Sequence, residues 1–316
     1  MGLSPHNFFF GPFRLISEID IPELHGVIGS GRLPVTIRSG NVPASISNAQ
    51  PLGNWCSVSL NEYLLDIEGV ARYYVGYGHD IRIQIIPGVA LSDISTYLLG
   101  SVFGALCHQN GLLPLHASAV ESSGIVTAFL GDSGAGKSTT AASLQRRGYP
   151  IVSDDICLLE PQSNSTEPSS IELEASMRVV PVAGWLKLWR QSLDHLGETP
   201  QEQNRTFSSD DKFRLYLSNQ DPTPRRIRNL VFLERASIPT QLPTLHPLSA
   251  SETIAAMMAK TYLSYVIELN RTQADLFRRC SAVLRDARGF RLTVPWGFHH
   301  IESVIDLVES TLLQPR

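Results

Sequence analysis

A glycine-rich octapeptide near the middle of the chain constrains its fold and chemistry more than any other feature. Residues 131–138 read GDSGAGKS and match the pattern G-x-x-x-x-G-K-[ST]. The apolar residues 125–130 before it predict a buried strand, and residues 137–147 predict a helix after it. A strand, a glycine-rich turn and a helix form the setting in which this pattern binds phosphate. The alternative is a glycine-rich turn that binds nothing.

Each part of this loop has an expected role toward a nucleotide. Its backbone N–H groups would cradle phosphates, Lys137 would reach the β- and γ-phosphates, and the Ser138 hydroxyl would ligate Mg²⁺. We therefore expect ATP and Mg²⁺ to bind here. The expected nucleotide-binding residues are Gly131, Asp132, Ser133, Gly134, Ala135, Gly136, Lys137, Ser138 and Thr139.

Two adjacent aspartates follow the loop after a short step. A helix over residues 137–147 spans about 16 Å at 1.5 Å per residue, and a glycine at 148 is the expected stop signal. Residues 149–153 then predict a strand that rises about 16 Å at 3.3 Å per residue. Because the lengths match, a right-handed βαβ return places Asp154 and Asp155 at the sheet edge that carries the loop. One carboxylate would hold Mg²⁺ and the other would accept a proton from an attacking hydroxyl. A strand-ending turn is the alternative.

His116 is a third candidate for the site. It lies on a predicted strand that ends in a turn, and a hairpin pivoting between Ser122 and Ser123 would place it opposite Phe129. An imidazole there would orient Asp154 or stabilise phosphoryl charge. A core histidine without a functional role is the more common outcome for a lone histidine on an apolar strand.

These residues together resemble the catalytic domain of HPr kinase/phosphatase. Leu115-His116-Ala117, the segment from residue 129 to 138, and the segment from 147 to 155 follow one another at the spacing of that family's histidine strand, phosphate loop and aspartate pair. The resemblance implies an α/β fold related to phosphoenolpyruvate carboxykinase. It further implies that His116 is a catalytic-site histidine, that Asp154 shuttles the proton and that Asp155 is linked to the metal. The two aspartates can exchange these roles, and Lys137 neutralises developing charge.

The chain also departs from the bacterial HPr enzymes. Ala117 replaces a glycine, Thr139 replaces a glutamate, and the Glu-Ile-Arg-Gly-Leu-Gly segment linked to oligomer formation and phosphorolysis is not found. A homo-oligomer is left open. Residues 11–24, GPFRLISEIDIPEL, resemble the opening of HPr-kinase-like proteins encoded beside peptide natural-product pathways. Some of those proteins phosphorylate the carboxy-terminal serine of lasso-peptide precursors.

Composition limits the partners and the compartment. The net charge is −4 and no block of Lys or Arg stands out, which disfavours nucleic acid as a partner. No run approaches the roughly 18 apolar residues of a membrane helix, so we expect no membrane partner. Four scattered cysteines without C-x-x-C spacing suit a reducing cytoplasm and argue against a structural zinc site: Cys56, Cys107, Cys157 and Cys280.

Along the chain we expect a strand-rich amino-terminal region over residues 1–110 and the catalytic domain over 111–316. Residues 91–107 predict a helix with one apolar face. The segment WLKLW at 185–189 predicts packing tryptophans on a helix or short amphipathic element, or else a peptide-binding edge. Residues 196–211 predict a mobile loop near the substrate. Lys212 after it is our first candidate for the extra cation that phosphoryl transfer needs, as a substrate or phosphate contact.

The sequence thus predicts an ATP- and Mg²⁺-dependent kinase of a serine in a peptide or protein, with a lasso-peptide precursor as one candidate acceptor. The alternatives are a small-molecule kinase with the same site and a non-catalytic nucleotide-binding regulatory module. A GTPase is disfavoured because no Asn-Lys-x-Asp motif is present, and an ABC-type ATPase because no Leu-Ser-Gly-Gly-Gln signature is present.

Overall fold

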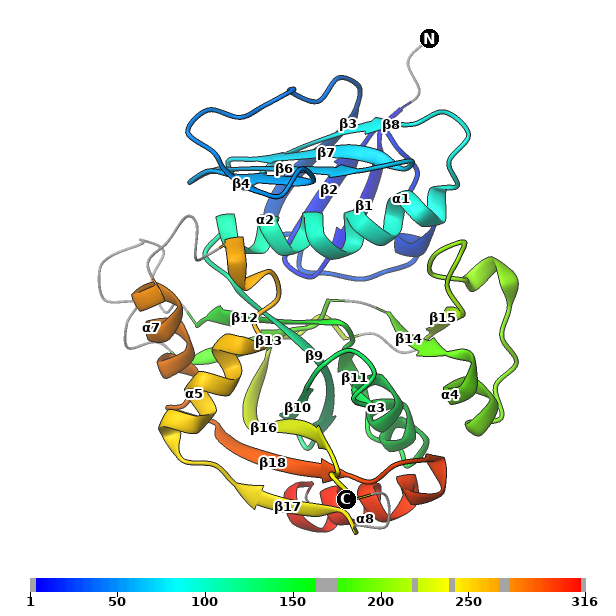
Figure 1. Cartoon of the computed structure of the whole chain (residues 1–316), viewed down its shortest axis with the longest axis vertical. Helices are drawn as coiled ribbons and strands as arrows, with labels where there is room; N and C mark the ends of the chain where they lie inside the picture. The colour runs from blue at the N-terminus through cyan, green and yellow to red at the C-terminus, as the bar shows by residue number, and fades with distance from the viewer. Residues whose placement is uncertain are drawn as a thin grey trace.

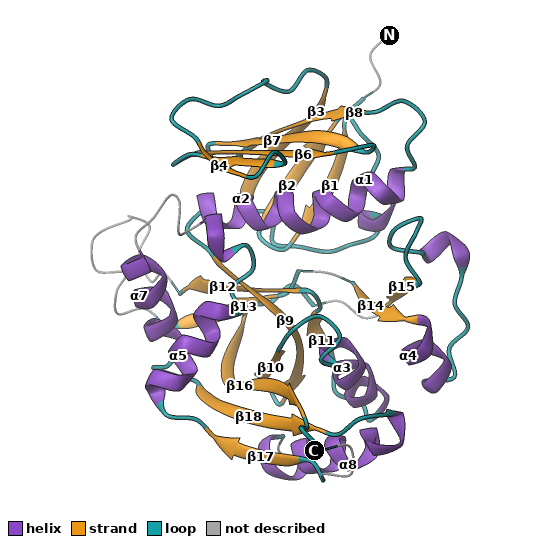
Figure 2. Ribbon diagram, in the orientation of Figure 1, coloured by secondary structure: helices purple, strands orange, loops and turns teal. Residues whose placement is uncertain are grey.

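The computed structural model describes residues 4–162, 176–182, 184–217, 221–238, 242–266 and 273–313, and its fold is mixed α/β. The strands of these residues form two eight-stranded sheets and a two-stranded ribbon. Figure 1 shows the first sheet at one end of the molecule and the second sheet, with most of the helices, at the other. A helical segment lies between the two sheets (Figure 2).

The first sheet takes its strands from the amino-terminal part of the chain. Their order is β1 (His6–Phe10), β2 (Phe13–Ser17), β3 (Leu33–Ser39), β8 (Asp80–Ile85), β7 (Ala71–Gly76), β6 (Glu62–Ile67), β5 (Cys56–Val58) and β4 (Gln50–Leu52). The buried face of this sheet packs against the helix that the apolar spacing predicts. That helix consists of α1 (Leu91–Tyr97), a π-helical turn (Leu98–Val102) and α2 (Phe103–Gln109). Leu158, Val180 and Trp185 belong to the same core, so buried contacts join the two sheets across residue 110.

The second sheet carries the glycine-rich loop. Its strands are β9 (Leu113–Ser122), β10 (Ile125–Leu130), β11 (Ile151–Ser153), β12 (Ile156–Pro161), β13 (Met177–Val180), β16 (Arg225–Arg235), β17 (Thr244–Pro247) and β18 (Arg288–Val294). Pairings of β9 with β10, β10 with β16, β16 with β13, β13 with β12 and β12 with β9 close five strands into a ring. Strands β10, β16 and β18 run parallel, so their carboxyl ends meet at one edge.

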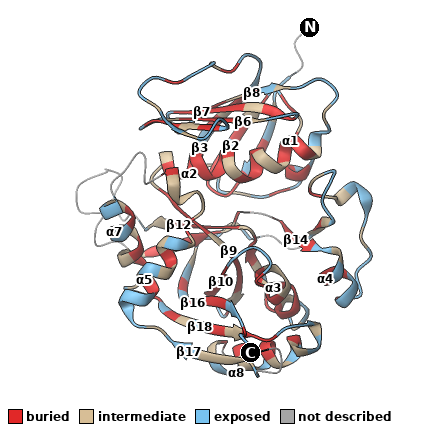
Figure 3. Ribbon diagram, in the orientation of Figure 1, coloured by how far each residue is buried: buried red, intermediate tan, exposed pale blue. Residues whose placement is uncertain are grey.

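Helices cover both faces of this sheet because the buried strands are apolar on both sides. One face packs on α5 (Ala250–Ala259) and α7 (Gln273–Val283), and the other on α3 (Lys137–Arg146) and α8 (Ile301–Leu312). The ribbon of β14 (Trp185–Trp189) and β15 (Lys212–Tyr216), together with α4 (Arg190–His195), joins the α3 side. Figure 3 shows the buried residues on the strands and on the inner sides of the helices. No described helix is both long and apolar enough to cross a bilayer.

Two local expectations need correction. The turn between β9 and β10 consists of Ser123 and Gly124, both with positive φ, so Ser122 pairs with Ile125 and the hairpin pivots one residue later than predicted. Phe129 therefore faces Ser118, and His116 lies beyond the paired end of β10. The return strand β11 is shorter than predicted, and it pairs with β9. Since β9 is antiparallel to both, β11 still runs in the direction of β10.

Candidate functional site

The 131–138 loop joins β10 to the amino terminus of α3. Gly134 and Gly136 have φ values of +79° and +103°, a region that side-chain-bearing residues rarely adopt. A Cβ on Gly131 would lie 3.0 Å from the carbonyl oxygen of Leu233, so a side chain there would crowd the neighbouring strand. The loop thus folds as its glycine spacing predicts, with backbone N–H groups at the first turn of a helix.

Lys137 folds back over this loop. Its Nζ donates to the carbonyl oxygens of Gly131 (2.9 Å) and Asp132 (3.0 Å). Burial lowers the pKa of Lys137, although Asp155 and Asp154 act in the opposite direction. Lys137 therefore places a partly desolvated amino group next to the turn, in the position expected of a phosphate-binding lysine.

The Asp154 carboxylate is buried and held on both oxygens. Ser138 Oγ donates to its Oδ1 at 2.8 Å, and Ser118 Oγ donates to the same oxygen at 2.6 Å. The backbone N–H of Lys187 donates to Oδ2 at 2.7 Å. Three donors from three separate elements therefore fix Asp154 beside the loop. The prediction that the aspartates reach the sheet edge that carries the 131–138 loop is confirmed.

Asp155 points to a different set of partners. It lies at the break between β11 and β12 with φ of +69°, a left-handed conformation that turns its side chain away from that of its neighbour. Lys187 Nζ is 2.8 Å from its Oδ2, and His116 Nε2 is 3.5 Å from its Oδ1. Burial acts to raise the pKa of Asp155, but Lys187, His116 and Lys212 together hold it well below its usual range.

His116 belongs to the same cluster. On β9 it pairs with Ile156 of β12, and its ring meets that of Tyr262 edge to face, with centroids 5.8 Å apart. Burial lowers the pKa of His116 from 6.5, while the nearby Asp155 acts to raise it. The imidazole is therefore neutral at pH 7 and is able to accept or relay a proton.

These groups line one pocket of about 330 Å³. The predicted residues that line it are His116, Ser133, Gly134, Gly136, Lys137, Ser138, Thr139, Asp154, Asp155 and Lys212. Three predicted loop residues do not line it: Gly131, Asp132 and Ala135. They shape the loop instead, since Gly131 accepts from Lys137, the Asp132 carboxylate pairs with Lys260, and Ala135 is buried.

The β14–β15 ribbon supplies site residues that the sequence analysis did not assign. Residues 185–189 form a strand and not a helix, so the Leu186 and Leu188 side chains pack in the core on one face, and Lys187 and Trp189 lie on the other. Lys187, Leu188 and Trp189 line the pocket. Trp189 pairs in register with Lys212, whose Nζ is 5.8 Å from the indole centroid. The alternation of Leu with Lys and Trp over residues 185–189 is the sequence pattern that indicates a strand with one face in the core and the other toward the pocket.

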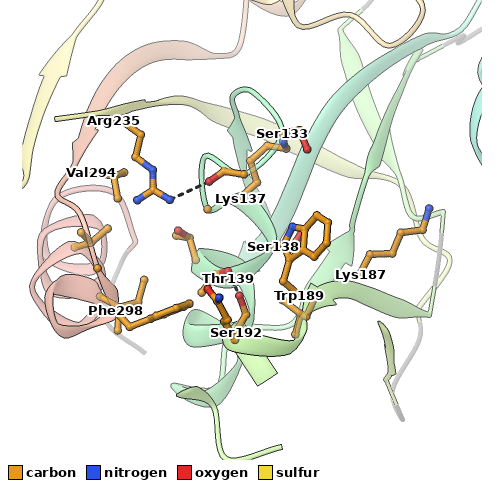
Figure 4. Close-up of a pocket in the computed structure, with 18 of the residues that line it drawn as sticks. Ser133, Lys137, Ser138, Thr139, Lys187, Trp189, Ser192, Arg235, Val294 and Phe298 are labelled. Carbon is orange, nitrogen blue, oxygen red and sulfur yellow. Dashed lines mark hydrogen bonds between the residues drawn. The ribbon is translucent and has the colours of Figure 1, made fainter. Parts of the chain in front are cut away.

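The sequence carries no signal for further pocket residues, because they lie at or just beyond the ends of strands far along the chain: Arg235, Val294, Trp296 and Phe298. Ser118 was missed as well, although it repeats the polar position of His116 two residues further along β9. Figure 4 shows Arg235, Val294 and Phe298 on one side of Thr139, and Trp189 and Lys187 on the other.

The expected substrate loop at residues 196–211 has a different position. None of its residues lines the pocket. Ser208 instead donates through its N–H and Oγ to the two oxygens of Asp93 on α1, both at 2.8 Å, and Thr206 O accepts a hydrogen bond from Thr96 Oγ1. This loop therefore ties α4 and β15 to the helix of the first sheet.

Neither a protein-family model nor a curated protein matches this chain. The pocket residues combine a glycine-rich turn at a helix start, two carboxylates, two imidazoles (His116 and His300) and three lysines (Lys137, Lys187 and Lys212).

Proposed function

We propose that this chain is a kinase that transfers the γ-phosphate of ATP to a serine hydroxyl of a peptide or protein, with a P-loop core of the HPr kinase/phosphoenolpyruvate carboxykinase type. The contact of Ser138 Oγ with Asp154 carries the proposal, because it joins the phosphate-loop hydroxyl to a carboxylate from a separate strand. Asp155 and His116 lie beside it and supply proton-accepting groups. A glycine-rich turn that binds nothing does not require two carboxylates and an imidazole beside it.

The oxygens of Ser138 and Asp154 fit Mg²⁺, a hard cation that prefers hydroxyl, carboxylate and phosphate oxygens. Within the described residues, no three His, Cys, Asp or Glu side chains gather into a metal-holding cluster. Mg²⁺ in kinases commonly takes only one or two carboxylates and leaves other positions to water and phosphate, so the pair is sufficient. When bound, the ion would neutralise charge on the β- and γ-phosphates.

This assignment exchanges the roles that the resemblance implies for the two aspartates. Asp154 already accepts from Ser118, Ser138 and the Lys187 N–H, which orients it toward the loop and leaves it less room to meet an acceptor hydroxyl. Both aspartates line the pocket, but it is Asp155 that lies beside His116. We therefore assign Asp154 to the metal side and Asp155 to the acceptor hydroxyl.

In the proposed step the acceptor oxygen bonds to the γ-phosphorus as the bond to the ADP oxygen breaks. The hydroxyl proton passes to Asp155, whose low pKa suits a late transfer in a loose transition state. His116 orients that carboxylate and can take the proton onward. Lys137 and Lys212 supply positive charge for the transferring group, and Lys187 orients Asp155.

Residues 11–24 support a peptide acceptor through their resemblance to kinases of lasso-peptide precursors. The test is ATP consumption with and without candidate serine-terminated peptides, combined with mass spectrometry for the gain of one phosphate. Peptide-dependent turnover and a phosphoserine product are expected. Turnover that requires a small alcohol instead would support the small-molecule kinase, and ATP binding without turnover under any acceptor would support a regulatory module.

A further inference from the structure

The ends of the parallel strands divide the pocket into two sides. The 131–138 loop follows β10, Arg235 ends β16, and Val294 ends β18. Across the sheet the order is β12, β9, β10, β16 and β18, so the aspartates lie on one side of the loop and residues 294–304 on the other. Ligands of such sheets bind outside the carboxyl ends of parallel strands.

The β18 side of the pocket differs in chemistry from the aspartate side. It contains no carboxylate, and His300 is the polar side chain among residues 294–304 that line it. The other lining residues of this range are Val294, Pro295, Trp296, Gly297, Phe298, Ile301 and Val304. We call Trp296 and Phe298, with Ile301 and Val304 behind them, the aromatic wall. A highly charged triphosphate gains no binding energy from an apolar aromatic surface, whereas a heteroaromatic base stacks on it.

The two rings of the aromatic wall are held in place. Trp296 Nε1 donates to Ala236 O at 2.9 Å, and the Arg235 guanidinium lies 5.4 Å from the indole centroid. Phe298 stacks on His195 of α4, with centroids 5.0 Å apart and planes 24° apart. Trp296 nevertheless keeps 53% of its surface exposed. A fixed and exposed aromatic surface is preorganised for a planar ligand.

The wall is also joined directly to the phosphate loop. Arg235 donates to Gly134 O at 2.9 Å, so the side chain beside Trp296 also contacts the loop. Thr139 Oγ1 and Ser192 Oγ, 3.0 Å apart, lie between Phe298 and Trp189 (Figure 4). These hydroxyls offer polar partners to a ribose between the loop and the wall.

We propose that the aromatic wall is the nucleoside site of this chain and binds the base of the phosphate donor by stacking. This rests on the proposed function and adds to it the direction of the donor: the base lies toward β18 and the γ-phosphate toward Asp155. The rival site is Trp189, the exposed indole on the aspartate side of the loop.

The test compares ATP with inorganic triphosphate by calorimetry in the presence of Mg²⁺. Phe298→Ala and Trp296→Ala should each weaken ATP binding about tenfold, because one base stack is lost, and leave triphosphate binding unchanged. Trp296→Phe should restore most of the affinity. Trp189→Ala is the matched control and should leave the ATP-to-triphosphate affinity ratio unchanged.

Equal weakening of both ligands in the wall variants would overturn the proposal, because the wall would then act only through the loop. An ATP-selective loss in Trp189→Ala alone would overturn it too. If the wild-type chain binds neither ATP nor triphosphate, the proposed function fails and the wall assignment fails with it. Selective loss of ATP in the wall variants supports both.

Discussion

Ser138 Oγ lies 2.8 Å from Asp154 Oδ1, although a helix, a turn and a strand separate these residues along the chain. The contact sets the hydroxyl at the first turn of α3 against a carboxylate that Ser118 and the Lys187 N–H already orient. It is the geometric basis for separating a metal-side aspartate from an acceptor-side aspartate.

The two aspartates should therefore fail in different ways when changed to asparagine. Asp154→Asn should raise the Mg²⁺ concentration required for half-maximal activity about tenfold or more, since a metal-side carboxylate is lost. Asp155→Asn should lower kcat by about 10²-fold or more with the Mg²⁺ requirement unchanged, since the proton acceptor is lost. Steady-state kinetics at varied Mg²⁺ measure both effects.

Asp66→Asn is the control and should match the activity of the wild-type chain, because Asp66 lies half-exposed on β6 of the first sheet, where it pairs with Arg72. Full activity in Asp155→Asn would contradict the acceptor role. The reverse pattern of Mg²⁺ dependence would restore the original assignment of the two aspartates.

Lys187 should matter for turnover through Asp155. Lys187→Met removes the ammonium 2.8 Å from Asp155 Oδ2 but keeps the backbone N–H that binds Asp154. The pKa of Asp155 should rise, and kcat should fall about tenfold or more because the carboxylate loses its orientation. Lys187→Arg should retain part of the activity. Unchanged kcat in Lys187→Met would exclude a positioning role for this residue.

Protonation of His116 should determine how activity falls at acidic pH. Burial lowers its pKa from 6.5, so the imidazole is neutral near pH 7 and becomes protonated only as the pH falls below 6.5. Activity should drop over that interval, and stability should drop with it, because the unfolded chain binds the proton more readily there. His116→Gln should lower kcat and flatten this acid limb between about pH 5 and pH 7. A wild-type profile without an acid limb would argue against a functional neutral His116.

A buried ion pair anchors the ribbon to the connection between β2 and β3 of the first sheet. Arg214, opposite Lys187 in the β14–β15 register, has Nη2 3.3 Å from Glu23 Oε1, and their side chains are 2% and 6% exposed. Glu23→Gln should lower the free energy of unfolding by about 3 kcal/mol because it leaves a buried guanidinium unpaired. The double variant Glu23→Leu/Arg214→Met should lose less. Urea unfolding measures both.

Glu234→Gln tests the same type of change in an exposed pair, in which Glu234 contacts Arg291 at 3.1 Å. It should change the unfolding free energy by less than about 1 kcal/mol, because solvent screens exposed charges. An equal loss in Glu23→Gln and Glu234→Gln would mean that burial adds nothing to the inner pair.

Short-range features of the site follow from the sequence because local geometry fixes them. Gly134 and Gly136 adopt positive φ, α3 ends one residue earlier than predicted, and Gly148 follows with φ of +94°. The rise of the helix and of the following residues brings Asp154 to Ser138 as the spacing predicts. Ser249 and Glu252 form a capping box at the start of α5, another feature that local residue spacing sets.

Turn type and strand partner were harder to predict. When the pivot of the β9–β10 hairpin moves by one residue, the partner of every residue on β10 moves by two residues along β9. Phe129 therefore pairs with Ser118 in place of His116. The placement of β11 beside β9 depends on which apolar faces the whole sheet buries, and residues 149–153 carry no signal for that choice.

The sequence by itself determined the glycine-rich loop, the helix after it and the distance to the aspartates, because local backbone geometry over residues 131–155 sets all three. Only the tertiary structure decided that Lys187 meets Asp155, that Asp154 is enclosed by donors, and that an aromatic wall follows β18. These contacts join elements far apart in the chain, and they arise from the burial of apolar faces throughout the fold rather than from any local pattern.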